Sequence, residues 1–204
     1  MSIYTIGDLH LSFNEDKPMS VFGEIWNDYE DKIKEDWNQK VKEDDLVVLP
    51  GDFSWSMYLK DTYKDFEYLN KLPGKKLLLK GNHDYWWTTV TSMRNYIKEN
   101  NEAKKMINRE SARLELSIQD ALKEKEDDDE IIAFMHYPPI LKSNVQKNEM
   151  NEFIKVLKKY DIKKCYYGHL HSSSIKDAIE GVYFGIEFKL VSADGLNFKL
   201  EKVC

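Results

Sequence analysis

Residues 2–10 read SIYTIGDLH, a short run rich in apolar side chains that ends at Gly7 and Asp8. An apolar run closed by glycine predicts a buried strand that ends in a tight turn. The same pattern recurs at three later places in the chain, residues 46–52, 75–82 and 164–169, and a further apolar run, residues 131–136, ends at His136 without a glycine. Because amphipathic segments of helical period separate these runs, the sequence predicts an α/β layered fold with a largely parallel sheet.

The segments between and after these strands predict the remaining elements. Apolar residues at three- and four-residue steps indicate helices over four ranges: 22–41, 63–72, 85–125 and 153–157. The charged stretch 123–130 predicts a solvated loop. Three late runs, at 182–188, 189–192 and 196–203, predict consecutive antiparallel strands with a turn signal at Asp194-Gly195.

Composition narrows the class of protein. The chain has 204 residues, of which 42% are hydrophobic and 32% charged, and this fits one folded domain over residues 1–204. A net charge of −6 argues against a protein that mainly grips nucleic acid, because that affinity comes largely from lysine and arginine on phosphates. No apolar stretch approaches a membrane span of roughly 20 residues, and no signal peptide is expected. Two cysteines, Cys165 and Cys204, cannot form a disulfide framework, so we expect a reducing, cytoplasmic location.

Each of the five predicted strands ends in a side chain that can bind a metal: Asp8, Asp52, Asn82, His136 and His169. In α/β sheets ligands gather outside the carboxyl ends of the strands, so these side chains can converge on one crevice. His10 and His171 lie two residues beyond Asp8 and His169, and residues at i and i+2 of an extended chain point to the same side. All five histidines of the chain, His83 included, lie in these turns.

Each of these residues has a simpler interpretation when it is taken alone. A single histidine at a strand end is more often a hydrogen-bonded structural residue, and glycine followed by Asp or Asn is usually only a turn. Neither a helix face nor a solvent face explains why every histidine avoids the rest of the chain. The seven side chains that end the strands or follow them therefore predict a metal site.

Five ordered motifs carry a resemblance to a known family. They are Gly7-Asp8-Leu9-His10, Gly51-Asp52, Gly81-Asn82-His83-Asp84, His136 and Gly168-His169-Leu170-His171. In this order they resemble the five motifs of the calcineurin-like metallophosphoesterase superfamily, and residues 51–55 and 136–139 resemble a bacterial branch of predicted phosphohydrolases. The resemblance extends from residue 7 to residue 171. It implies a four-layer α/β/β/α sandwich, in which two mixed sheets pack face to face with helices outside.

The resemblance also implies two divalent metal ions. One would be held by Asp8, His10, His171 and Asp52, and the other by Asp52, Asn82, His136 and His169. A shared carboxylate is physically sensible, because two cations about 3.5 to 4 Å apart repel each other. Nitrogen and oxygen ligands without thiolate suit Mn, Fe, Zn or Co and do not choose among them. The family's catalytic histidine that does not bind metal corresponds to His83, and we expect Asp84 to orient its ring.

The function that the resemblance implies is hydrolysis of a phosphate ester, either a monoester or a small diester. A hydroxide that bridges the metals would attack phosphorus in line with the leaving group. His83 would stabilise the transition state or protonate the departing oxygen. The alternatives are a nuclease, which a local basic patch would favour, and a catalytically silent scaffold, which loss of ligands would favour. The expected partner is a small phosphate-ester substrate and neither nucleic acid nor a membrane, and the sequence sets no oligomeric state.

Side chains beside the motifs allow two interpretations. Four aromatic residues could stack on a nucleobase or aryl leaving group, but we expect them in the core: Trp55, Trp86, Trp87 and Tyr137. Arg94 could reach phosphate, although a surface ion pair is the simpler expectation. Cys165 lies inside a predicted strand and is expected to be a small core residue.

The segment between Asp84 and His136 departs from the family pattern. Members of the superfamily usually insert strands there, whereas residues 85–130 have a nearly continuous helical pattern. The pattern changes register around Asn100-Asn101 without a glycine or proline. We therefore expect either a smaller sheet with a more open cleft or a stretch of chain that is absent at this point.

Overall fold

The computed structural model describes residues 1–87 and 103–204, and eight strands of this part form two four-stranded sheets. The first sheet has the order β3-β2-β1-β8, formed by Lys75–Leu79, Leu46–Pro50, Ile3–Thr5 and Glu201–Lys202. The second has the order β4-β5-β7-β6, formed by Ala133–Met135, Lys164–Tyr167, Ile186–Leu190 and Gly181–Tyr183. Three neighbouring strands run parallel in each sheet, and one edge strand, β8 or β6, is antiparallel, so both sheets are mixed.

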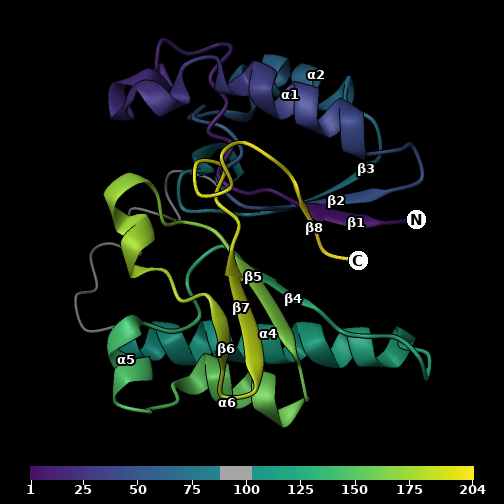
Figure 1. The fold of residues 1–204 in the computed structure, drawn as a ribbon, viewed down its shortest axis with the longest axis vertical. Coiled ribbons are helices and arrows are strands. Elements are labelled where there is room, and N and C mark those ends of the chain that lie inside the picture. The colour runs from purple at the N-terminus through teal and green to yellow at the C-terminus, as the bar shows by residue number, and fades with distance from the viewer. Residues whose placement is uncertain (88–102) are drawn as a thin grey trace.

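Helices cover the outer side of each sheet (Figure 1). Two lie over the first sheet: α1 is Tyr29–Lys40 and α2 is Tyr63–Asn70. Three lie on the side of the second sheet: α4 is Ala103–Glu124, α5 is Lys142–Gln146 and α6 is Glu152–Lys159. Short 3-10 helices fill connections: η1 to η5 are Met19–Phe22, Glu24–Trp26, Leu59–Asp61, Tyr85–Trp87 and Ser172–Asp177. The expected α/β/β/α sandwich is confirmed. No described helix is long and apolar enough to cross a membrane.

Three groups of buried apolar side chains hold the four layers together. The first, which includes Trp37 of α1, lies between the first sheet and its helices. The second lies between the second sheet and its helices and includes Cys165 and Tyr167 of β5. The third lies between the sheets and joins Tyr166 of β5 to Val203, which follows β8. Successive residues of β5 thus face opposite layers, as the two-residue period of a strand requires, and Cys165 is the small core residue that we predicted.

The carboxyl ends of strands from the two sheets meet at one edge. Gly7, which follows β1, forms an isolated parallel bridge with Ser192, which follows β7. The N–H of Gly7 donates to the carbonyl of Val191 at 2.7 Å. A second bridge pairs Leu11 with Ser54, so the loops after β1 and β2 lie side by side. The turns that follow the parallel strands of both sheets therefore open into one place.

The helix expected over residues 22–41 is wrong in its first part. The α-helix begins at Tyr29, and two 3-10 turns, η1 and η2, precede it. Gly23 has φ 132° and Asp28 has φ 53°, and neither value is compatible with a right-handed helix. Phe22 and Ile25, which belong to the apolar pattern of this range, are consequently exposed.

The expected arrangement of the last strands is also wrong. Residues 182–188 do not form one strand, because the chain turns at Phe184 and Gly185, which have φ 55° and 79°, to make the β6–β7 hairpin. The strands then part: β7 pairs parallel with β5 in the second sheet, and β8 pairs antiparallel with β1 in the first. The Asp194-Gly195 pair makes no hairpin between strands of one sheet.

The helix expected over residues 85–125 is only partly tested. The segment begins with η4, and α4 ends it at Glu124, as expected to within a residue. The predicted helical positions Val90, Met93 and Ile97, together with Arg94 and the register change at Asn100-Asn101, lie outside the described residues.

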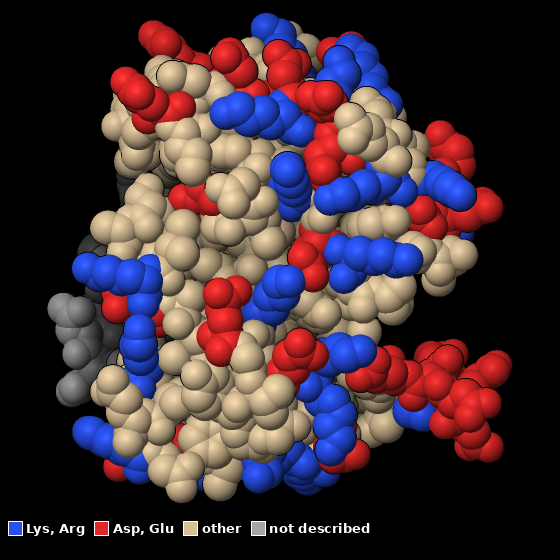
Figure 2. Space-filling view, in the orientation of Figure 1, with Lys and Arg blue, Asp and Glu red and all other residues tan. Residues whose placement is uncertain are grey.

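Charged side chains are spread over the surface. On the face shown in Figure 2, acidic and basic residues alternate, and no unbroken basic tract crosses that face. The loop that follows α4 carries a run of acidic residues, and apart from the half-buried Lys125 the whole stretch 123–130 is exposed. This agrees with the solvated loop that we predicted.

Candidate metal centre

The turns that carry the predicted ligands have an unusual backbone. Asp8, His10, Asp52 and His169 all have positive φ, between 46° and 75°. Left-handed conformations are uncommon for residues other than glycine and concentrate at functional sites. Hydrogen bonds between the turns hold them in place: the N–H of Asp8 donates to the carbonyl of Gly51, and that of His10 to the carbonyl of Asp52, both at 2.9 Å. The loops of β1 and β2 thus brace each other at the site.

Asp8, His10 and His171 form a first group of candidate ligands. One ligand atom from each lies within 4.8 Å of the others. His171 Nε2 is 3.2 Å from Asp8 Oδ1 and 3.3 Å from His10 Nε2. The side chains of Asp8 and His10 are almost fully buried, and His171 is half-buried. Two residues from the end of β1 and one from the end of β5 therefore converge, although 161 positions separate His10 from His171.

Asp52, His136 and His169 form a second group, again with ligand atoms within 4.8 Å of one another. Asn82 joins this group, because its Oδ1 is 2.7 Å from His136 Nε2. Asp52 Oδ2 lies 3.5 Å from His136 Nε2 and 3.8 Å from His10 Nε2. This one carboxylate oxygen is therefore near histidines of both groups.

Two glycines leave room for the carboxylates. A Cβ at Gly81 would collide with the side chain of Asp52, and a Cβ at Gly168 would collide with that of Asp8. Backbone N–H groups of the same loops orient these carboxylates: His83 donates to Asp52 Oδ1 at 2.8 Å, and His169 donates to both oxygens of Asp8 at 3.0 Å. Glycine at these two positions is a steric requirement of the site.

The electrostatics of the site favour a bound cation. Burial and the nearby His171 and His83 lower the pKa of His10 well below its usual value, so its ring is neutral and free to donate a lone pair. Its buried Nδ1 has no hydrogen-bond partner in the part of the chain that the structure describes. Burial and the adjacent Asp8 raise the pKa of Asp52 to about 6, against the opposing effect of His136. A neutral imidazole at His10 and two carboxylates that lie close together, Asp8 and Asp52, suit a divalent metal.

Comparison with known proteins agrees with this geometry. The family profile of the calcineurin-like phosphoesterases matches residues 1–173. The chain belongs to the calcineurin-like phosphoesterase family. Membership implies a hydrolase of phosphate esters and a dependence on metal ions.

Two solved structures share the fold of this phosphoesterase at low sequence identity. A protein of unknown function from Aquifex aeolicus superposes with a TM-score of 0.58 at 19% identity, over 98% of this chain and 95% of its own. Phosphopantetheinyl hydrolase from Mycobacterium tuberculosis superposes with a TM-score of 0.52 at 12% identity, over 99% of this chain and 95% of its own. No curated protein sequence matches the chain. At these identities the structural likeness concerns the fold alone.

Asp194 is a site residue of the phosphoesterase that our sequence analysis missed. Its carboxylate is buried, and Oδ1 lies 3.0 Å from Nδ1 of His171 while Oδ2 accepts from the N–H of Ser172 at 2.8 Å. Burial lowers the pKa of His171, but its hydrogen bonds to Asp194 and Asp8 outweigh this effect and raise it to about 10. The signal was present in the sequence, because Asp194 follows the apolar run that forms β7, just as the candidate ligands follow their own strands.

The expected role of Asp84 is wrong. Its buried carboxylate does not orient the ring of His83, whose buried Nδ1 has no hydrogen-bond partner among the described residues. The carboxylate instead accepts five hydrogen bonds, from the backbone N–H groups of Asp52, Phe53, Ser54 and Gly81 and from Nε1 of Trp86. Asp84 therefore ties the turn after β3 to the turn after β2.

His83 lies beside the ligands, among aromatic rings. Its ring centroid is 5.5 Å from that of His10 and 4.6 Å from that of Trp55. We expected the aromatic residues near the motifs in the core, and this holds for Trp86, which packs partly buried against the first core. Trp87 and Tyr137 are 43% and 52% exposed, so the expectation is wrong for both. The expectation also holds for Trp55, which is half-buried against the same core and stacks on His10.

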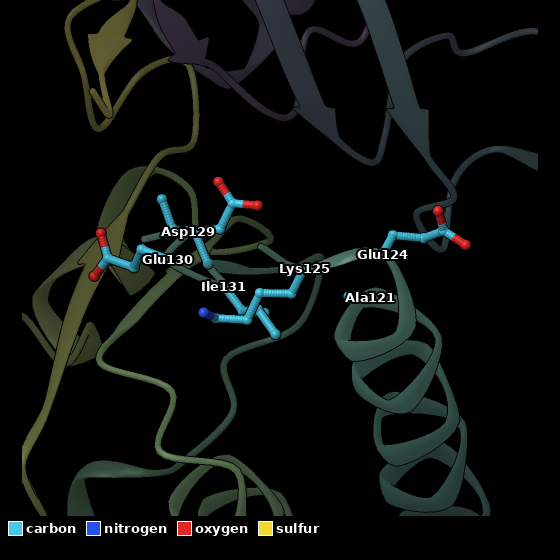
Figure 3. Close-up of a pocket in the computed structure, with 7 residues that line it drawn as sticks. Ala121, Glu124, Lys125, Asp129, Glu130 and Ile131 are labelled. Atoms are coloured by element: carbon cyan, nitrogen blue, oxygen red, sulfur yellow. The ribbon is translucent and has the colours of Figure 1, made fainter. Parts of the chain in front are cut away.

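A separate depression of about 400 Å³ lies at the far end of the second sheet (Figure 3). Its lining comes from the end of α4 and the loop before β4: Ala121, Glu124, Lys125, Asp129, Glu130, Ile131 and Ile132. These residues precede β4, whereas His136 follows it. The depression is therefore not part of the candidate metal centre.

Proposed function

We propose that this chain is a dinuclear metal-dependent hydrolase of small phosphate esters. One metal would be held by Asp8, His10, His171 and Asp52, and the other by Asp52, Asn82, His136 and His169. The observation that carries the proposal is the position of Asp52 Oδ2, which is within 3.8 Å of a histidine from each group. Family membership supports it, and the nitrogen and oxygen donors suit Mn, Fe or Zn.

The bound cations would supply a hydroxide nucleophile at neutral pH and neutralise the phosphoryl oxygens for an in-line displacement. The residues of the chain position the reactants. His83 is the proposed catalytic residue, because its ring lies next to the ligands and its backbone N–H holds Asp52. Burial and the neighbouring His136 and His171 lower the pKa of His83, so its ring is neutral at pH 7. Its N–H can then donate to a phosphoryl oxygen or to the departing oxygen.

The two alternatives receive less support. A nuclease needs a basic surface for the phosphate backbone, and neither the net charge of −6 nor the face in Figure 2 offers one. A silent scaffold of the same fold usually loses ligands, whereas all seven ligand positions and His83 are filled here. We propose a cytoplasmic location, in keeping with the two free cysteines, Cys165 and Cys204.

The proposal is tested by metal analysis of the purified protein followed by turnover of phosphomonoesters and phosphodiesters with Mn, Fe or Zn. We expect about two metal ions per chain, and turnover that a chelator removes and added metal restores. A chain that binds two metals and hydrolyses neither ester class would refute the proposed function. The ratio of monoester to diester turnover would also decide the substrate class.

A further inference from the structure

The histidines proposed as metal ligands differ in what holds their rings. Nδ1 of His136 lies 3.0 Å from the carbonyl oxygen of Pro50, and Nδ1 of His171 lies 3.0 Å from Oδ1 of Asp194. Such contacts fix a ring whose other nitrogen faces a metal. His10 Nε2 also faces the candidate ligands, 3.3 Å from Nε2 of His171, but its buried Nδ1 has no hydrogen-bond partner in the described part of the chain. A hydrogen bond to a described residue therefore does not orient the His10 ring.

The backbone of His10 is held, so only the angle of its ring is left to be set. Its N–H donates to the carbonyl of Asp52 at 2.9 Å, and its carbonyl accepts from the hydroxyl of Tyr29 at 3.0 Å. These two bonds do not restrict rotation about χ2, which for histidine is a broad torsion. A contact with the ring itself has to set this angle.

Trp55 makes a contact of this kind. Its ring stacks on that of His10, with centroids 4.6 Å apart and planes inclined by 23°. The rings of His83 and His171 are inclined to the His10 ring by 65° and 58°, so of these three neighbours only Trp55 lies flat against it. Rotation of the imidazole would drive its edge into the indole, because packed side chains leave no room between them.

Trp55 is itself fixed, so it can act as a support. Its Nε1 donates to Sδ of Met19 at 2.9 Å, and its backbone N–H donates to the carbonyl of Leu11 at 2.9 Å. Phe22 lies nearly parallel to the indole as well, with centroids 6.5 Å apart and planes inclined by 17°. The faces of the indole are thus covered by His10 and Phe22, and the ring serves packing and not the binding of a flat ligand.

The stack favours the metal-bound form of His10. A contact changes the affinity for a metal only if it is more favourable in the bound state than in the free state. A ring that is already oriented loses less rotational freedom when it binds. An imidazole that donates its lone pair to a cation also becomes electron-poor, and the π-face of an indole attracts electron-poor groups. Both effects act in the same direction.

We propose that Trp55 is a positioning residue of the metal centre: its indole face, in place of a hydrogen bond at Nδ1, holds the imidazole of His10 in the orientation that binds a metal. The inference rests on the proposed function, because it takes His10 as a ligand. The effect is confined to the ion assigned to the group of Asp8, His10 and His171, since the stack acts through His10. Its expected size is about 2- to 12-fold in metal affinity, the range for one aromatic pair.

The test is a titration of the metal-free protein with Zn or Mn against a competing chelator, which resolves two binding constants. Trp87 is 43% exposed and packs against Trp86, so Trp87→Leu is the matched control. We expect Trp55→Leu to weaken one constant about 2- to 12-fold and to leave the other unchanged. Trp55→Phe, which keeps a ring but has no Nε1, should recover most of the affinity.

Thermal unfolding of the metal-free variants shows whether each one folds. Trp55→Met gives the same comparison without a ring if Trp55→Leu does not fold, because methionine fills irregular space well. Three outcomes would overturn the role: unchanged constants in the ringless variants, equal losses in both constants, or a loss that Trp55→Phe does not reduce. A lower kcat at saturating metal with unchanged constants would overturn it too, since Trp55 would then act through His83, whose ring is 4.6 Å away.

Turnover separates this inference from the proposed function. Two bound metals without ester hydrolysis, together with a selective loss in Trp55→Leu, would refute the function and leave the role of Trp55 in place. Ester hydrolysis by the wild type, with unchanged metal constants in the ringless variants, would refute the role of Trp55 alone. A wild-type chain that binds no metal would refute both.

Discussion

Asp194→Asn tests whether the carboxylate behind His171 matters for metal binding. Asp194 accepts from three donors: Nδ1 of His171 at 3.0 Å, the N–H of Ser172 at 2.8 Å and the N–H of Gly195 at 3.0 Å. Asparagine has nearly the same shape but only one acceptor oxygen, and its amide group can only donate. The variant therefore turns an amide donor toward either His171 or the N–H of Ser172, and it also removes a buried negative charge behind the ring.

The size of the effect follows from these contacts. A hydrogen bond to a charged group contributes about 1.5 to 3 kcal/mol. Loss of a carboxylate that orients a metal-binding histidine typically costs about 10- to 100-fold in metal affinity. That factor corresponds to roughly 1.4 to 2.8 kcal/mol, so the two estimates agree. Because Asp194 contacts only the first group of ligands, we expect one of the two metals to weaken and the other to bind as before.

The assay is a titration of the metal-free protein with Zn or Mn against a competing chelator, which resolves two binding constants. Asp177→Asn is the matched control, because Asp177 is exposed on η5 and the substitution makes the same change in charge. Thermal unfolding of both metal-free variants separates a metal effect from a folding defect. If Asp194→Asn binds both metals with wild-type affinity, the contact with His171 does not support the site.

Three further predictions concern the proposed ligands and the catalytic histidine. Asp52→Asn should sharply reduce the metal content measured by elemental analysis and abolish turnover, because Asp52 is the proposed shared ligand. A variant with two bound metals and normal turnover would refute the proposal that Asp52 binds both ions. His83→Ala should retain both metals and lose about 100- to 10,000-fold in kcat, and loss of metal would make His83 a ligand instead. Metal affinity should fall as the pH is lowered from 8 to 6, because the raised pKa of His171, about 10 without metal, means that the ion must displace a proton. Each displaced proton changes the metal affinity about tenfold per pH unit. Calorimetry in buffers of different ionisation enthalpy would detect the proton release. A metal affinity that does not depend on pH would contradict the raised pKa of His171.

The local sequence pattern was sufficient to predict those elements that depend only on residues close together in the chain. The apolar runs before Asp8, Asp52 and His169 identified strands that the structure contains, because burial between layers needs consecutive apolar residues. The spacing of apolar residues failed to predict where α1 begins, because the helical spacing continues through Gly23 and Asp28 in residues 22–28. The positive φ values of these two residues end the helix, and spacing alone carries no information about them.

The final strands show a second limit. The sequence indicated strands between residues 181 and 203, but it did not show that β7 and β8 belong to different sheets. Pairing of β7 with β5 and of β8 with β1 depends on layers that form only when the whole chain has folded. The turn expected at Asp194-Gly195 is present, but the sequence did not show that it links strands of different sheets or that Asp194 contacts His171.

The sequence by itself determined the chemistry that this protein can carry, since the identity and order of the metal-binding side chains are set by short turns at strand ends. Only the tertiary structure decided how these side chains are grouped, that Asp52 stands between the two groups, and that Phe22 extends the stack of Trp55 on His10. The physical reason is distance along the chain: contacts such as His10 with His171 join residues 161 positions apart, and the packing of two sheets against each other brings them together.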